Sequence, residues 1–187
     1  LYPDGSETSR TYDAYGNVLS ETDQAGRTIW MDYNDLNQLV EVRQLPVVGS
    51  GDYAITQYGY DVQGQKISQI DALGRKTTWA YDTFGRVLYR ALPSGEAETF
   101  SYLLDGRTEN HVDFNGLETR FEYDNFGRLT EKYWIDGIND DVPDVIYSYD
   151  SLGRINQATK GDVSVQYGYD DVQKTLTSLN YPGIGQI

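Results

Sequence analysis

The stretch Tyr81-Asp82-Thr83-Phe84-Gly85-Arg86-Val87-Leu88 decides the fold, because its pattern Tyr-Asp-x-x-Gly-Arg returns along the whole chain. Full copies begin at Tyr123 and Tyr149, and weaker copies are distributed from one end of the sequence to the other. Self-similarity at a fixed period is the signature of a repeat architecture. The repeat-defining residues, for which we predict structural roles, are Tyr12, Asp13, Gly16, Tyr33, Asn34, Asn37, Tyr60, Asp61, Gly64, Tyr81, Asp82, Gly85, Arg86, Tyr102, Gly106, Arg107, Tyr123, Asp124, Gly127, Arg128, Tyr149, Asp150, Gly153, Arg154, Tyr169 and Asp170.

The eight copies keep a register of 21 residues. The residues that follow the repeat tyrosines are numbers 13, 34, 61, 82, 103, 124, 150 and 170, so two steps are longer than the rest. We assign the excess to insertions near 47–53 and 136–144. Turns of a second kind lie midway between the copies, for example Asp71 to Arg75 and Pro93 to Gly95. Residues 1–187 are therefore expected to form a single array of about eight units, truncated at both ends.

Asp-x-x-Gly is a turn with a physical cause. An Asp or Asn side chain accepts hydrogen bonds from backbone amides further along the turn, and Gly supplies the positive φ of a type I turn followed by a bulge. Asn37 stands in for Gly in the second copy, and Asn is the residue next best able to adopt a positive φ. Gln173 is a poor substitute and predicts a distorted turn. Leu103 removes the Asp cap of its turn at a cost of about 1 kcal/mol, by analogy with other caps.

Turns every ten or eleven residues leave strands of about six residues, and the sequence between them alternates with a period of two. Thr119, Phe121 and Tyr123 oppose Glu118, Arg120 and Glu122, an apolar–polar alternation typical of an antiparallel sheet. The fold class that follows is all-β, with tandem antiparallel β-hairpins forming one continuous sheet; that this sheet is a coiled strip is implied by the family resemblance given below.

Aromatic residues explain what holds such an array together. An aromatic residue stands two positions before six of the repeat tyrosines, and positions two apart share a face of a strand. The members of this second row are Tyr58, Trp79, Phe100, Phe121, Tyr147 and Tyr167. We interpret this aromatic column, the repeat tyrosines together with the second row, as the core between units. A carbohydrate-binding platform is the alternative. Trp30 and Trp134 fall outside the column and are predicted to be exposed ligand contacts.

The remaining chemistry of the chain points away from catalysis. The 29 acidic and 15 basic residues give a net charge of −14, which argues against nucleic acid and anionic membranes as partners. Cysteine is absent and His111 is the sole histidine, here interpreted as an ordinary strand or turn residue. The Arg residues that follow Gly are expected to pair with nearby turn carboxylates, and the runs at Asn139–Asp141 and Asp170–Asp171 to be solvated loops rather than Ca²⁺ sites. We predict no enzyme activity, catalytic residue, cofactor or metal, and no insertion into a membrane.

The repeated Tyr-Asp-x-x-Gly-Arg with apolar residues after it, as in Tyr81 to Leu88, resembles the Rhs, or YD-repeat, proteins. The resemblance extends from Pro3 to Gly183. It implies that the chain is one segment of a larger hollow shell, as in bacterial Rhs toxins, the shell components of insecticidal toxin complexes and teneurins. The Asp-Pro motif that such bacterial shells use for self-cleavage does not occur in this sequence.

The function expected from this resemblance is structural. The segment would form wall that encloses or displays another polypeptide, typically a toxin, within a large secreted or cell-surface protein. A cell-surface carbohydrate-binding repeat module is the alternative, with glycans as ligands. The expected partners are the rest of the parent chain and the enclosed polypeptide. Unpaired terminal strands predict that the fragment associates with itself, because exposed sheet edges invite pairing.

Overall fold

The computed structural model describes residues 7–45, 52–137 and 140–182. Within these residues the regular structure consists of sixteen β-strands and no helix, which confirms the all-β fold expected from the turn spacing. The strand order is the chain order, and every pair whose register is defined is antiparallel. The strands are β1 Ser9–Tyr12, β2 Val18–Thr22, β3 Thr28–Tyr33, β4 Leu39–Gln44, β5 Ala54–Tyr60, β6 Lys66–Ile70, β7 Lys76–Tyr81, β8 Val87–Ala91, β9 Ala97–Tyr102, β10 Thr108–Val112, β11 Glu118–Tyr123, β12 Leu129–Ile135, β13 Val145–Tyr149, β14 Ile155–Lys160, β15 Val163–Tyr169 and β16 Leu176–Asn180.

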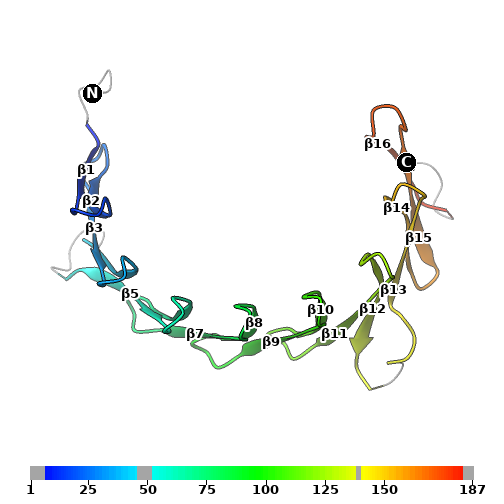
Figure 1. The fold of residues 1–187 in the computed structure, drawn as a ribbon, viewed down its shortest axis with the longest axis horizontal. Coiled ribbons are helices and arrows are strands. Elements are labelled where there is room, and N and C mark those ends of the chain that lie inside the picture. The colour runs from blue at the N-terminus through cyan, green and yellow to red at the C-terminus, as the bar shows by residue number, and fades with distance from the viewer. Residues whose placement is uncertain (1–6, 46–51, 138–139, 183–187) are drawn as a thin grey trace. The chain divides into compact units, whose positions relative to one another are not determined.

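The chain divides into two compact units. The first comprises residues 1–97 and contains β1 to β8, and the second comprises residues 98–187 and contains nearly all of β9 and the strands up to β16. Each unit is a meander in which a strand pairs with the strand before it and the strand after it (Figure 1). The description of residues 1–187 as one array of about eight repeats stays a prediction.

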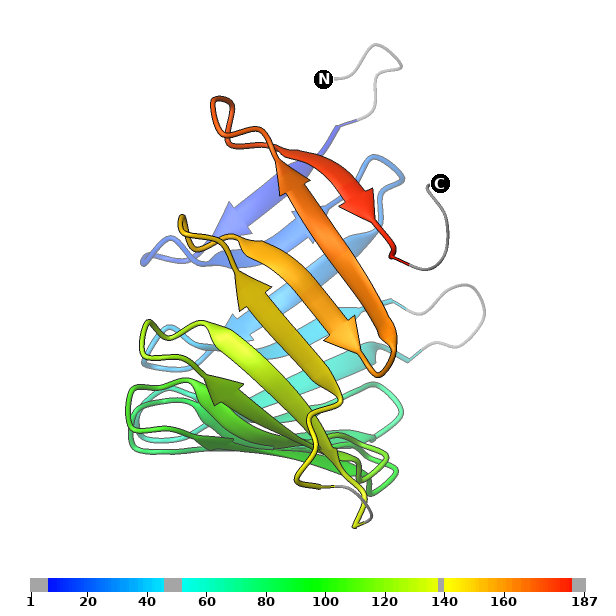
Figure 2. The same cartoon turned by 90° about the vertical axis from the view of Figure 1, so that its right-hand side faces the viewer.

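The repeat tyrosines mark a break in the strand register. In all eight Tyr-Asp hairpins the pairing shifts by one residue just before the tyrosine of the Tyr-Asp step, as between Glu122 and Tyr123 or between Ser101 and Tyr102. This shift is the β-bulge that accompanies a turn with a positive-φ residue at its end. The Tyr-Asp turns join odd-numbered strands to the even-numbered strands that follow them. The mid-unit turns join even-numbered strands to odd-numbered ones. The two kinds of turn therefore lie at opposite ends of the strands, as the hairpins β13 to β16 show in Figure 2.

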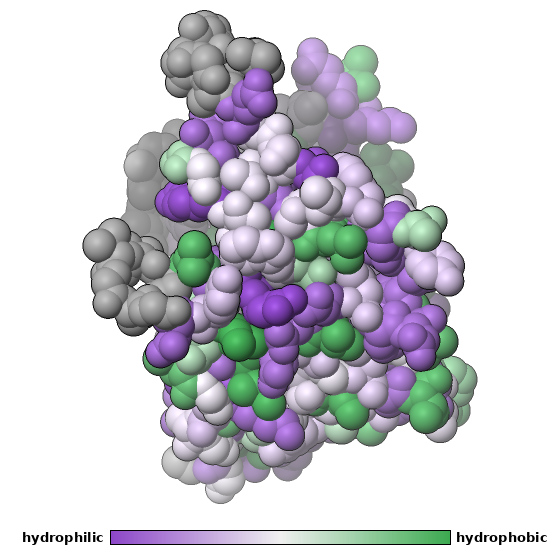
Figure 3. Space-filling view, turned by 90° about the vertical axis from the view of Figure 1, so that its left-hand side faces the viewer, coloured by the Kyte–Doolittle hydropathy of each residue, from purple (hydrophilic) through white to green (hydrophobic). Residues whose placement is uncertain are grey.

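Burial corrects the prediction of an aromatic core. Among the described residues Tyr133 is the sole buried hydrophobic side chain, with 7% of its surface exposed, and the column tyrosines from Tyr33 to Tyr169 are half-buried. The physical reason is the architecture within each compact unit, since the described residues of each form a meander of hairpins, which is a single layer of sheet. On the face of the molecule shown in Figure 3, apolar residues are interspersed with hydrophilic ones rather than gathered into one patch.

The two predicted insertions fall between even and odd strands, at the mid-unit edge. Residues 46–51 and 138–139 lie outside the described residues. In the second insertion the Oδ1 atom of Asp140 accepts hydrogen bonds from the amides of Asp136 and Gly137, both at 2.9 Å. The Oδ2 atom of Asp144 accepts one from the Trp134 amide at 2.6 Å. The carboxylates of Asp140 and Asp144 therefore bind backbone amides of the insertion and of the adjacent end of β12.

Candidate functional site

The Tyr-Asp turn is closed by its own side chains in the way the sequence predicts. At Asp124 the backbone N–H of the aspartate donates to the Arg128 carbonyl at 2.9 Å. The Oδ1 atom of the same aspartate accepts the amides of Phe126 and Arg128 at 2.9 Å each, and Gly127 has a φ of 82°. The pKa of Asp124 lies below its usual value. The largest cause is a hydrogen bond from the Arg128 side chain, and the backbone bonds from Arg128 and Phe126 add to it. Asn37 adopts the predicted positive φ, at 59°.

The tyrosines of the Tyr-Asp step connect each hairpin to the one before it. Each hydroxyl group donates to a backbone carbonyl just after the preceding Tyr-Asp turn. The acceptor is the residue two positions after the Gly or Asn of that turn. The bond from Tyr123 reaches Thr108 at 2.8 Å, and the bond from Tyr149 reaches Leu129 at 2.6 Å. We call this set the tyrosine ladder. Its members are Tyr33, Tyr60, Tyr81, Tyr123, Tyr149 and Tyr169.

Arginine side chains tie the turns together in a second way. The Nε atom of Arg128 donates to Asp124 Oδ2 within its own turn at 2.7 Å, as predicted for the arginines that follow Gly. Its guanidinium carbon also lies 4.4 Å from the centre of the Tyr149 ring, a ladder residue of the next unit. Arg154 repeats this arrangement with Asp150 and the Tyr169 ring and adds an ion pair with Asp171 at 2.7 Å. One arginine side chain thus binds the Asp carboxylate of its own turn and also contacts the tyrosine ring of the next 21-residue repeat.

The two irregular turns show which residues the repeat needs. Leu103 closes its turn with the standard backbone bonds, and Asp105 replaces the missing cap by accepting the Arg107 amide at 3.1 Å and its side chain. In the last turn the positive φ moves from position 173 to Lys174, and the Asp170 amide donates to Thr175, five residues on. The turn is therefore one residue longer, which confirms the predicted distortion at Gln173.

The second aromatic row is accompanied by the protein's own cations. Lys66 Nζ lies 4.3 Å from the centre of the Trp79 ring and 5.8 Å from that of Tyr58. Lys132 Nζ lies 5.7 Å from the ring centres of both Phe121 and Tyr147. Each lysine therefore lies close to the aromatic side chains of two successive 21-residue repeats. This arrangement stabilises the contact between the repeats by cation–π attraction.

His111 lies opposite Phe100 on the neighbouring strand, just as Lys132 lies opposite Phe121. Its ring stacks on Phe100 with centres 4.5 Å apart, and its Nε2 atom lies 3.3 Å from Glu98 Oε2. This position on a strand fits the interpretation of His111 as an ordinary strand residue.

Neither tryptophan predicted to be an exposed ligand contact is fully exposed. Trp134 pairs with Thr119, which shares a face with Phe121 and Tyr123, so the prediction that it lies off the aromatic column is wrong. Lys160 Nζ lies 4.3 Å from its ring centre. Trp30 does lie on the other face, but its half-buried ring makes an edge contact with Tyr53 at 5.6 Å.

The other face carries one buried group in the second unit. Tyr133 pairs with Arg120, whose guanidinium carbon lies 4.2 Å from the ring centre. Its hydroxyl donates to Glu131 Oε2 at 2.7 Å, and this bond, together with burial, raises the pKa of Tyr133 to about 12. No sequence signal separated Tyr133 from the other tyrosines, because it belongs to neither repeated position.

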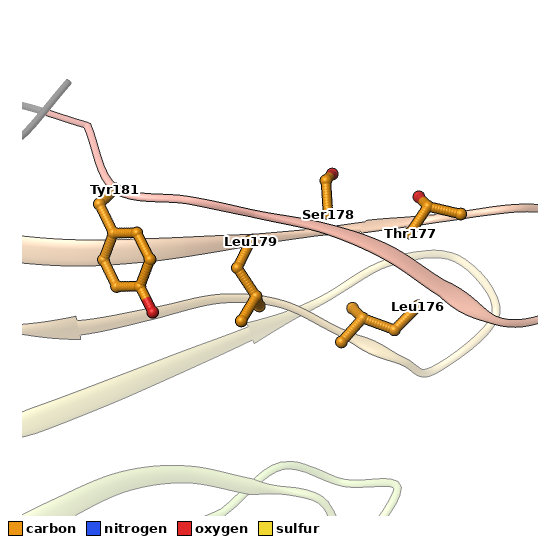
Figure 4. A pocket seen from close by; sticks show the side chains of 5 residues that line it. All are labelled: Leu176, Thr177, Ser178, Leu179 and Tyr181. Atoms are coloured by element: carbon orange, nitrogen blue, oxygen red, sulfur yellow. The ribbon is translucent and has the colours of Figure 1, made fainter. Parts of the chain in front are cut away.

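The hollow beside β16 is lined by Leu176, Thr177, Ser178, Leu179 and Tyr181, with no charged group (Figure 4). Leu176, Leu179 and Tyr181 project to one side of the strand and the two hydroxyl residues to the other (Figure 4). Within the described residues no group of three His, Cys, Asp or Glu side chains is arranged to hold a metal ion, and no helix is long and apolar enough to cross a membrane.

Comparison with solved structures finds the same fold in toxin complexes. The crystal structure of TcdB2-TccC3-TEV superposes with a TM-score of 0.80 and 15% identity, over 98% of this chain and 10% of that chain. The structure of the Photorhabdus luminescens Tc holotoxin pore gives a TM-score of 0.79 at 15% identity, over 96% of this chain and 10% of that one. At this level of identity the likeness concerns the fold alone.

Sequence comparison finds a curated relative and a family. The double-stranded DNA deaminase toxin A of Burkholderia cenocepacia (strain H111) is 34% identical over 101 residues, which are 54% of this chain but 7% of that protein. The family model of the teneurin YD-shell matches residues 3–180. Since that match covers nearly the whole chain, this chain belongs to the teneurin YD-shell family and is a structural segment of such a shell.

Proposed function

We propose that this chain is a stretch of shell wall that encloses or displays another polypeptide, typically a toxin, within a large secreted or cell-surface protein. The observation that carries the proposal is the tyrosine ladder, in which the hydroxyl of Tyr81, Tyr123 or Tyr149 bonds to the backbone of the preceding hairpin. The repeated side chains are thus used to join hairpins to one another. A wall needs such joints at every unit, whereas a catalyst needs a few convergent groups at one place.

The contacts of the aromatic column weigh against a ligand platform. A sugar ring stacks on an open aromatic face, but Lys66 and Lys132 already lie close to aromatic rings of this column. The turn arginines do the same to the ladder tyrosines, as Arg128 does to Tyr149. We therefore assign the column to cohesion between units and expect no enzyme activity from this segment.

The enclosed polypeptide is suggested by the relatives. One is named a deaminase toxin, and the solved structures of like fold come from toxin complexes. This chain matches about a tenth or less of each of those chains. The rest of the parent chain would supply the remaining wall and the polypeptide inside it, and secretion or surface display would follow from the same parent.

Carbohydrate binding remains the second candidate, and one hollow favours it. A depression of about 600 Å³ in the second unit is lined by Trp134, Asp144 and Lys160 among others, which combines an indole with hydrogen-bonding groups. If this hollow binds glycans, Trp134→Ala should abolish binding on a glycan array while leaving the melting temperature nearly unchanged. If the residue serves cohesion, the same change lowers the melting temperature and the wild-type protein binds no glycan.

The decisive experiment uses the full-length parent protein. It is purified under native conditions and treated with protease, with and without prior denaturation, and the fragments are identified by mass spectrometry. Enclosure predicts that a region outside the repeats resists protease until the shell is denatured. The double variant Tyr81→Ala, Tyr123→Ala should release that protection, whereas Tyr89→Ala, a half-exposed tyrosine outside the ladder, should retain it. Equal digestion of every region before and after denaturation would contradict enclosure.

A further inference from the structure

The second insertion and the strands beside it form a hollow that the repeat itself does not require, here called the insertion hollow. Its volume of about 600 Å³ lies within the range of about 300–1,000 Å³ that small-molecule sites occupy. The hollow lies at the mid-unit end of the strands, away from the Tyr-Asp turns. Insertions in a repeat array often mark the side on which such a protein binds other molecules. The side chains that line it include Trp134, Asp136, Val142, Pro143, Asp144 and Lys160.

The insertion is anchored where the sheet has its one buried hydrophobic side chain among the described residues. Tyr133 is 7% exposed, and the guanidinium carbon of Arg120 lies 4.2 Å from its ring centre. The Nη2 atom of the same arginine donates to the backbone carbonyl of Asp140, within the insertion, at 3.2 Å. At the end of the insertion, Asp144 accepts the Trp134 amide at 2.6 Å. The walls of the hollow are thus held in place before a ligand arrives, which reduces the entropy lost on binding.

The hollow combines an aromatic ring with hydrogen-bonding groups of both kinds. The indole of Trp134 offers an apolar surface to the C–H groups of a sugar ring. Lys160 Nζ lies 4.3 Å from the centre of this indole and makes no ion pair within the described residues, so its N–H groups can donate to a ligand. The carboxylate of Asp144 has acceptor positions beyond the one that the Trp134 amide takes. A ligand rich in hydroxyl groups can use all three side chains at once.

The charges around the hollow favour an uncharged ligand. Asp136 and Asp144 carry two negative charges against the one positive charge of Lys160, in a chain with a net charge of −14. A ligand carboxylate or sulfate would meet this excess of like charge at a partly buried site, where repulsion is stronger than in water. A ligand cation would compete with Lys160, which already lies against the indole. A neutral hydroxyl suits both signs of charge, since it donates to a carboxylate and accepts from an ammonium group.

We propose that the insertion hollow is a preformed binding site for a neutral sugar, a hexose or an N-acetylhexosamine. Its ring would pack against Trp134, and its hydroxyls would bond to Asp144 and Lys160. The inference rests on carbohydrate binding, the second function proposed for this chain, and deepens it by naming the class of sugar and the residues that select it. It does not depend on enclosure, because the tyrosine ladder and the hollow use different side chains.

The test applies the full-length parent protein to an array of neutral glycans and their sialylated or sulfated forms, followed by calorimetric titration. We expect binding to the neutral forms, and Trp134→Ala should weaken it roughly tenfold or more. Should Trp134→Ala fail to fold, Val142→Glu tests the same site, because this insertion residue is 62% exposed and the new charge would enter the hollow. The matched control is Trp30→Ala, a half-buried tryptophan that contacts Tyr53 outside the hollow. Melting curves show which variants are folded.

Three results would overturn the inference while leaving carbohydrate binding in place. They are a preference for sialylated or sulfated glycans, neutral-glycan binding that survives the folded Trp134→Ala or Val142→Glu variant, and an equal loss of affinity in Trp30→Ala. Binding of no glycan by the wild-type protein would overturn both the inference and the carbohydrate function. Protease protection in the parent protein is measured separately, so enclosure can hold or fail independently of each of these outcomes.

Discussion

At the scale of single residues, the ladder tyrosine does two things with one side chain. Its ring makes a cation–π contact with an arginine of the preceding Tyr-Asp turn; the guanidinium carbon of Arg107 lies 4.6 Å from the centre of the Tyr123 ring. Its hydroxyl donates a hydrogen bond to a backbone carbonyl of the preceding hairpin. Half-burial of the ring raises the pKa of Tyr123, so the hydroxyl stays protonated and able to donate throughout the physiological range. The hydroxyl and the ring can therefore be separated by mutation.

Tyr123→Phe removes the hydroxyl and keeps the ring. We expect a loss of about 1 kcal/mol in the free energy of unfolding, because the Thr108 carbonyl loses its donor while the packing survives. The corresponding fall in melting temperature is about 2–4 °C, measured by differential scanning calorimetry. Tyr89→Phe is the control, since no hydrogen bond of its hydroxyl is seen among the described residues. Equal melting temperatures for wild type and Tyr123→Phe would show that the ladder bond contributes nothing.

Gly85 and Gly116 test the turn backbone, because both have a φ of 83°. Alanine at either position should cost about 1–2 kcal/mol, since a side chain disfavours that conformation. A Cβ at 85 would also meet Gln65 Nε2 at 2.9 Å, but this atom ends a flexible side chain and can move aside, so we expect nearly equal losses. Urea unfolding measures both, with Thr83→Ala as the control. A much larger loss at 85 would show that the Gln65 contact is rigid.

Sequence reasoning found the residues whose partners are close in the chain and missed those whose partners are distant. Asp124, Gly127 and Arg128 interact within five residues, so their pattern discloses their contacts. The acceptor of the Tyr123 hydroxyl lies fifteen residues away and is defined only by the register of the intervening strands. Trp134 was misplaced for a similar reason, because its face is set by its pairing with Thr119 across the hairpin.

At the scale of the hairpin, a turn that begins with an Asp of lowered pKa is sensitive to acid. The turn aspartates with a lowered pKa are Asp13, Asp23, Asp71, Asp82, Asp113, Asp124 and Asp150. A hydrogen bond from the Arg128 side chain lowers the pKa of Asp124, and a backbone bond from Leu117 lowers the pKa of Asp113. A carboxylate whose pKa is lower in the folded state stabilises the fold above its unfolded pKa of about 4 and loses this effect as the pH falls through the folded value. The behaviour occurs in turns of both kinds, at Asp82 and Asp150 among the Tyr-Asp turns and at Asp23 and Asp71 among the mid-unit turns.

We therefore expect the urea midpoint to stay constant from about pH 8 to pH 5 and to fall below about pH 4. The variant Asp124→Asn should start from a lower midpoint and show a shallower acid loss, because one of the titrating groups is gone. A midpoint that already changes between pH 7 and pH 6 would contradict this prediction.

At the scale of the whole molecule, the sequence predicted the class of fold and its repeat but not how much would be buried. The alternation around Phe121 and Tyr123 indicates a sheet with one apolar face, and such a face suggests a core. Within each compact unit the described meander is a single layer, and the contacts of Arg128 and Lys132 with aromatic rings on neighbouring strands supply part of the cohesion. Layer number is a global property that no local pattern contains.

The isolated 187-residue chain is predicted to associate with itself through its terminal strands. β1 and β16 each pair with one neighbour, so their outer backbone groups remain available for another copy. Analytical ultracentrifugation over a wide concentration range should show reversible association. Proline in place of Thr177 and Leu179 on β16 should reduce it, whereas Thr83→Ala, in a turn away from the terminal strands, serves as the comparison. A monomer at every concentration would refute the prediction.

Because the ladder bonds point back to the hairpin made just before, this sheet suits a chain that emerges in order from a ribosome or an export channel. When Tyr81 or Tyr149 leaves such a tunnel, the carbonyl it requires is already outside and already in place. No segment has to wait for a distant part of the polypeptide, so each newly exposed hairpin can add to a growing end. The same sheet, pulled from its last strand, would come apart in the reverse sequence, one hairpin at a time.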